Sequence, residues 1–336
     1  MKIAITGLPG SGRSTIASAL NGGELPAGKG SSAIITARVP DPRVDRLSEM
    51  YKPKKTTYAQ VEYLVPTAAG DKGPESFWNE ARNADALIQV VRNFVNGAPP
   101  DAAADVKKLA SDMAFADYSV LEKRIERLDH EKGRGKKVVE DEYAVVADAK
   151  LALEGERPLR DIPEIADSPI LRGFGLLTAK PVLYLLNNEE TDGDLPGLAG
   201  VPSEDCMAVR GMIESEIAGM DETEAAEFLS EYGITESALS RIIRRSYRML
   251  GLASFFTVGE DEVKAWTVRE GEAAVDAADV IHSDIRKGFI RAEVVHYDDL
   301  MAAGSHAEAK KQAKVRLEGK TYPVTDGDII NFRFNV

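Results

Sequence analysis

A glycine-rich segment near the N-terminus has the residue types and spacing of a phosphate-binding loop. It reads Gly7-Leu8-Pro9-Gly10-Ser11-Gly12-Arg13-Ser14 and fits G-x-x-x-x-G-K-[ST] except that arginine replaces the lysine. Glycines let successive backbone N–H groups turn toward an anion, and a following helix adds the positive end of its dipole. The segment predicts a nucleotide-phosphate site with Mg²⁺ at the Ser14 hydroxyl, formed by Gly10, Ser11, Gly12, Arg13, Ser14 and Thr15.

Arg13 predicts binding with impaired chemistry. Lysine reaches phosphates as a compact charge on a flexible stem, whereas arginine is a wide planar fork that need not fit the same curled loop. The competing interpretation is a glycine-rich turn that binds no phosphate, since such turns join strands to helices in many α/β proteins.

The elements around this loop predict an open α/β sheet. The apolar run Ile3–Ile5 precedes the loop, and the helical pattern Ile16–Leu20 follows it. We expect further strands at residues 33–39, 58–65, 86–91 and 181–186, with residues 52–55 as a turn. Because the last two runs are almost entirely apolar and helical stretches separate the strands, the sequence predicts a doubly wound, mainly parallel sheet.

Two further regions depart from the α/β pattern. Residues 116–130 and 140–154 predict an antiparallel, coiled-coil-like helical hairpin with a basic tip at 132–137. A solvated insert and a recognition arm explain this hairpin equally well. From Ser254 onward, short strand-like segments surround one expected helix at 273–281, which predicts a small α+β domain with a mixed sheet.

The chain resembles the Obg-like ATPase family known as YchF, a branch of the P-loop GTPase class. The resemblance is most specific in the C-terminal blocks, namely 255–259, 265–267, 287–294, 317–322 and 326–336. Further family-like segments are 39–43, 52–55, 84–86 with 90–92, and 177–181.

This resemblance implies three domains. They are a P-loop nucleotide-binding domain (1–112 and 175–252), a helical hairpin insertion (113–174) and a C-terminal ubiquitin-like β-grasp domain of the TGS type (253–336). It also implies that Asn187 and Glu190 read the base, in a family variant that favours adenine, so that ATP, or alternatively GTP, is the ligand. A ribosome or RNA partner is implied as well.

The sequence departs from the family pattern where catalysis is expected. The aspartate that holds magnesium at the end of the third strand aligns with Val65 or Thr67, and the following switch segment is short. Phosphoryl transfer depends on clamping by lysine and Mg²⁺, so we expect weak or lost hydrolysis. The alternative is a nucleotide-free scaffold that acts through the helical arm and the TGS domain. A small-molecule kinase shares only the loop.

Composition limits the classes of partner. The chain has 336 residues and a net charge of −13, which argues against broad binding to naked nucleic acid. No apolar run reaches the roughly 18 residues of a membrane span. The lone Cys206 cannot form an intrachain disulfide, so we expect a cytoplasmic protein. The oligomeric state is left open.

Overall fold

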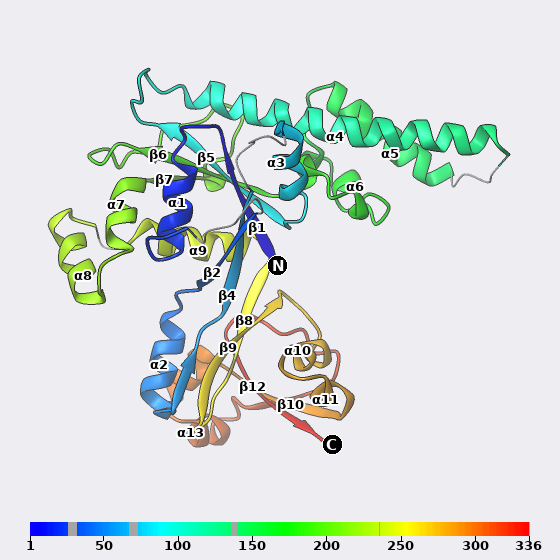
Figure 1. The fold of residues 1–336 in the computed structure, drawn as a ribbon. Helices are drawn as coiled ribbons and strands as arrows, with labels where there is room; N and C mark the ends of the chain where they lie inside the picture. Colours follow the sequence, from blue (N-terminus) through cyan, green and yellow to red (C-terminus); the bar gives the residue numbers. More distant parts are fainter. Residues whose placement is uncertain (26–31, 67–72, 136–139, 235, 336) are drawn as a thin grey trace. The chain divides into compact units, whose positions relative to one another are not determined.

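The computed structural model describes residues 1–25, 32–66, 73–135, 140–234 and 236–335. They form two compact units. Unit 1 comprises Met1–Ala37 and Glu62–Ile242, and unit 2 comprises Arg38–Val61 and Ile243–Val336. Each unit is built around its own six-stranded sheet (Figure 1).

The sheet of unit 1 has the order β2-β4-β1-β5-β6-β7. Its strands from β4 to β7 pair in parallel, which confirms the predicted doubly wound sheet. Side chains of the central strands are buried on both faces, as near-continuous apolar runs require. The strands are β1 (Lys2–Gly7), β2 (Ala33–Arg38), β4 (Gln60–Val65), β5 (Ala86–Asn93), β6 (Val182–Asn188) and β7 (Cys206–Val209).

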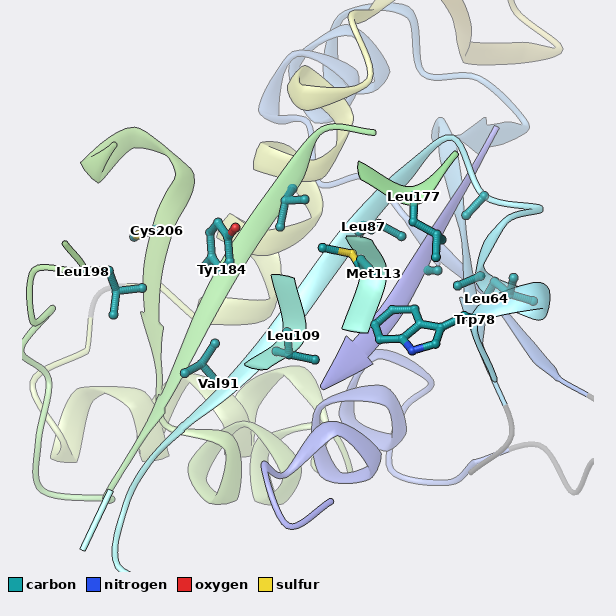
Figure 2. Packing of buried hydrophobic residues seen from close by; sticks show 14 of the residues in the cluster. Leu64, Trp78, Leu87, Val91, Leu109, Met113, Leu177, Tyr184, Leu198 and Cys206 are labelled. Carbon is teal, nitrogen blue, oxygen red and sulfur yellow. The ribbon is translucent and has the colours of Figure 1, made fainter. Parts of the chain in front are cut away.

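Helices pack on this sheet and contribute apolar side chains to its hydrophobic core. Trp78, Leu109 and Met113 reach the sheet from two helices and pack with strand residues in one buried cluster (Figure 2). Cys206 belongs to the same cluster, and burial raises the pKa of its thiol. The helices of unit 1, not all of which contact the sheet, are α1 (Arg13–Leu20), α3 (Gly73–Ala81), α4 (Ala102–Gly133), α5 (Glu140–Glu154), α6 (Pro163–Ala166), α7 (Gly211–Ile217), α8 (Glu222–Glu231) and α9 (Ala238–Met249), whose end belongs to unit 2.

The predicted helical hairpin is confirmed as α4 and α5, which run side by side (Figure 1). Leu121 of α4 packs with Val146, Ala149 and Leu153 of α5 in a separate core cluster. Arg124 and Glu142 join the two helices through an ion pair of 2.6 Å. However, α4 begins at Ala102, well before the expected helix, and its first half packs on the sheet. Lys136 and Lys137 of the expected tip lie outside the described residues.

Unit 2 has the predicted β-grasp form. Strands β8–β9 and β10–β12 pair antiparallel, β12 and β8 pair in parallel, and α10 packs against β9 and β10. Residues 321–324, one of the segments with a strand-like sequence, form only an isolated bridge, between Pro323 and Ala273, because proline has no N–H to donate to a ladder. The elements are α2 (Pro42–Tyr51), β3 (Lys55–Thr57), β8 (Leu252–Thr257), β9 (Glu262–Arg269), α10 (Ala274–Ile281), α11 (Ser283–Lys287), β10 (Phe289–His296), α12 (Tyr297–Ala303), α13 (His306–Lys311), β11 (Arg316–Glu318) and β12 (Asp328–Phe334).

One part of unit 2 comes from far upstream in the chain. The expected turn at residues 52–55 leads directly into β3, which pairs in parallel with β9 at the edge of the β-grasp sheet. Residues 38–61 therefore group with the C-terminal region, although Gln60 and Val61 begin strand β4 of the unit 1 sheet. The predicted three-domain division stays a prediction. Among the helices that the structure describes, none is both long and apolar enough to cross a membrane.

Candidate functional site at the phosphate loop

The loop between β1 and α1 presents backbone N–H groups at the start of a helix. Gly10 and Gly12 have φ angles of 81° and 85°, in the left-handed region that glycine adopts without strain. Gly12 occupies the N-cap position of α1, and no side chain caps this end. The N–H groups of the first turn therefore remain available to an anion, as a phosphate cradle requires.

Close packing explains why the loop needs glycines. A Cβ atom on Gly7 would lie 2.6 Å from the carbonyl oxygen of Val90 and 2.7 Å from Ser11 Oγ. A Cβ atom on Gly12 would collide with the side-chain amide of Asn187. Substitution at either glycine would thus deform the cradle.

The side chain of Asn187 holds the loop in place through two hydrogen bonds. It is buried at the end of β6, its Nδ2 donates to the carbonyl oxygen of Ser11 at 3.1 Å, and its Oδ1 accepts from the N–H of Gly211 at 2.9 Å. The predicted base reader therefore ties the loop to the start of α7. Glu190 has an exposed side chain, and its backbone carbonyl accepts from Arg210 at 3.4 Å. A base-reading role for these two residues stays a prediction.

A cavity of about 620 Å³ opens beside the loop. Of the predicted residues, Gly10, Gly12, Arg13 and Ser14 line it, whereas Ser11 is buried, with a hydroxyl that has no hydrogen-bond partner. Thr15, Asn187 and Glu190 are not part of the lining. The lining residues are Gly7, Leu8, Pro9, Gly10, Gly12, Arg13, Ser14, Phe77, Trp78, Lys108, Leu109 and Asp112.

Arg13 is a partly buried cation in this cavity. Its guanidinium carbon lies 5.0 Å from the centre of the Phe77 ring. Burial lowers the pKa of Arg13, because desolvation disfavours the charged form. No carboxylate of the described residues pairs with it. An anion bound in the loop would give this guanidinium a negatively charged partner.

The donors around the loop fit a magnesium ion only in part. Ser14 is exposed and lines the cavity, but Val65, at the end of β4, is buried and offers no oxygen ligand. Thr67, the other candidate position, lies outside the described residues. Asp112 is the one carboxylate among the described lining residues. Mg²⁺ commonly keeps several waters and uses nucleotide phosphates as ligands, so Ser14 could hold it with few protein ligands.

The cavity contains five residues that the sequence analysis missed. Phe77 and Trp78 come from α3, and Lys108, Leu109 and Asp112 come from α4. The sequence feature that could have indicated them is the apolar pair Leu109 and Met113, whose four-residue spacing is typical of the buried face of a helix.

Comparisons with known proteins agree across nearly the whole chain. A family model described as "Protein of unknown function (DUF933)", named YchF-GTPase_C, matches residues 252–335. The "Ribosome-binding ATPase YchF" of Bacillus subtilis (strain 168) is 37% identical over 99% of this chain and 98% of its own length. The chain belongs to the YchF family. A protein of the same description from Pasteurella multocida (strain Pm70) is 37% identical over 100% of this chain and 99% of its own.

A solved YchF structure has the same fold. The YchF GTPase of Schizosaccharomyces pombe matches with a TM-score of 0.84 and 28% identity, covering 99% of this chain and 97% of the other. The predicted YchF family membership and fold class are therefore confirmed, including the C-terminal domain.

Proposed function

We propose that this chain binds ATP, or alternatively GTP, in the phosphate loop of unit 1, acts at the ribosome, and hydrolyses its nucleotide slowly or not at all. The relatives are described as ribosome-binding ATPases or as a GTPase. A place in the cytoplasm is part of the same proposal, since ribosomes are the expected partner. The nucleotide-free scaffold has no support from these relatives.

The observation that carries the proposal is the intact backbone of the cradle. The left-handed glycines, the uncapped start of α1 and the clamp from Asn187 keep the geometry of a phosphate site. The two charged groups that accelerate hydrolysis are the parts that differ, since Arg13 replaces lysine and neither Val65 nor Thr67, the two candidate positions for the aspartate, is a carboxylate. Nucleotide binding depends mainly on the backbone of the loop, whereas hydrolysis depends on the charged groups.

Calorimetric titration with ATP and GTP, each with and without Mg²⁺, tests the proposal on protein freed of bound nucleotide. We expect micromolar binding of ATP that strengthens with Mg²⁺. Ser14→Ala should lose the Mg²⁺-dependent gain. The matched control is Ser18→Ala in the same helix, where the hydroxyl bonds to the carbonyl oxygen of Gly23, and it should keep the gain. Absence of binding of either nucleotide would refute the proposed site.

The preference for adenine or guanine and the binding to ribosomes are tested in separate experiments. Glu190→Ala should reduce the ratio of ATP to GTP affinity if its exposed carboxylate reads the base. Co-sedimentation with ribosomes, with and without ATP, should show binding that responds to the nucleotide. Rapid ATP turnover by the native protein would contradict the slow-hydrolysis part alone.

A further inference from the structure

Among the residues that the structure describes, the helical wall of the cavity carries one cation. This wall consists of residues from α3 and α4, and among its described members Phe77, Trp78 and Leu109 are apolar while Asp112 is acidic. Lys108 is the one positively charged member. Together with Arg13 of the loop, it gives the cavity two cations against one carboxylate, so the described lining has a net charge of +1. An anionic ligand therefore fits this cavity.

The position of Lys108 is fixed by the packing of α4. Leu109 and Met113 are buried in the core of unit 1, and the buried Asp117 accepts hydrogen bonds from the N–H groups of Leu177 at 3.0 Å and Thr178 at 2.7 Å. This part of α4 is therefore anchored to the sheet domain. Lys107, its neighbour in sequence, lines a different cavity beside Phe115 and Arg157.

The present partner of Lys108 can be exchanged for a ligand. Its Nζ atom lies 2.5 Å from Asp112 Oδ1, one helical turn away, and the lysine side chain is 62% exposed. Exposed pairs at this spacing contribute little stability. A phosphate carries more charge than one carboxylate and would compete effectively for the ammonium group.

Arg13 provides a positive charge but not the compact, flexible ammonium group that a lysine would provide, and Lys108 carries such a group. Its planar guanidinium lies over the Phe77 ring, an arrangement that a compact lysine at the same position would not need. We infer that Lys108 contacts the terminal phosphate of a nucleoside triphosphate and thereby distinguishes triphosphate from diphosphate. This inference rests on the proposed nucleotide site, and it adds the residue that selects among its ligands.

The test compares ATP and ADP affinities of full-length variants by calorimetry. Lys108→Gln should weaken ATP binding about tenfold, as loss of a charge-assisted hydrogen bond does, while ADP binding stays within about twofold. Lys107→Gln is the matched control, because it removes the same charge from the same helix but faces another cavity, and it should change neither affinity. Unchanged thermal midpoints would show that both variants are folded.

Asp112→Asn gives a prediction of opposite sign. It frees Lys108 and removes a negative charge from the lining, so ATP affinity should rise, and rise more than ADP affinity. Weaker ATP binding by this variant would overturn the inference, since the carboxylate would then support the ligand. Equal losses of ATP and ADP in Lys108→Gln, or an equal effect of Lys107→Gln, would overturn it while leaving the nucleotide site standing. Failure of the native protein to bind either nucleotide would remove both proposals.

Discussion

At the scale of single residues, Arg13 decides what the loop can do. Its guanidinium is held over Phe77 without a carboxylate partner among the described residues, so it favours an anion nearby. A planar guanidinium that is held against an aromatic ring moves less freely with the transferred phosphate than the flexible ammonium group of a lysine does. The proposed slow hydrolysis therefore treats Arg13 as a group that binds the nucleotide and not as the one that stabilises the transition state.

Replacing Arg13 by lysine should raise ATP hydrolysis. We expect Arg13→Lys to increase the single-turnover rate by about 10- to 100-fold, since one preorganised charge is typically worth about 10² to 10³ and Val65 still supplies no carboxylate. Arg13→Gln is the comparison that removes the charge, and it should weaken ATP binding without raising the rate. A lysine variant that binds ATP normally but turns over no faster would show that Arg13 does not limit catalysis.

Residues close to a strong motif could be predicted from sequence, and more distant ones could not. The glycine spacing located Gly10, Gly12, Arg13 and Ser14, which the structure brings to one cavity. Lys108 and Asp112 were missed because a lysine and an aspartate on a helix surface ordinarily face solvent. Only the packing of α4 reveals that they line this cavity.

At the scale of elements, α4 joins the sheet of unit 1 to the helical hairpin. Its first half carries Leu109 and Met113 into the sheet core, and its second half carries Leu121 into the hairpin core. Between these stretches, Asp117 is fully buried and pairs with Arg82 at 2.5 Å. The same carboxylate accepts two backbone N–H groups and the hydroxyl of Thr178.

Loss of this carboxylate should destabilise unit 1. Asp117→Ala leaves Arg82, whose side chain is 12% exposed, without its acidic partner, and such a loss typically costs about 3–5 kcal/mol. Asp129→Ala, at an exposed acid of the same helix, should change the free energy of unfolding by no more than about 0.5 kcal/mol. Urea denaturation measures both. Equal, small effects would show that the ion pair does not anchor α4.

The types of these elements were predictable, whereas several of their boundaries were not. Apolar periodicity identified the buried strands and both hairpin helices. The alanine-rich start of α4, from Ala102, has few large apolar residues to show that periodicity. Strand β3 has only three residues, and its pairing depends on β9, about 200 residues later in the sequence.

At the scale of the whole molecule, unit 2 is assembled from two separated stretches of chain. Arg43 of α2 pairs with Asp326 at 2.7 Å and lies over the Phe256 ring, while β3 adds a strand beside β9. Asp326 also accepts from the N–H of Ser254 at 2.8 Å. Family resemblance located the C-terminal domain, but no local pattern indicates that residues 38–61 complete its sheet.

Because unit 2 is assembled from two stretches of chain, we expect the C-terminal stretch to be less stable when it is alone. A fragment of residues 238–336 should be less stable than the same region in the full chain, since the edge of β9 and the Phe256 ring lose their cover. A synthetic peptide of residues 38–61 should bind the fragment and raise its thermal midpoint, because ligands of the folded state stabilise it. Arg43→Ala in the peptide should weaken binding about tenfold, whereas Glu49→Ala, at a side chain 66% exposed, should not. A fragment that is fully stable and does not bind the peptide would show that residues 238–336 fold without residues 38–61, which would then be a peripheral attachment.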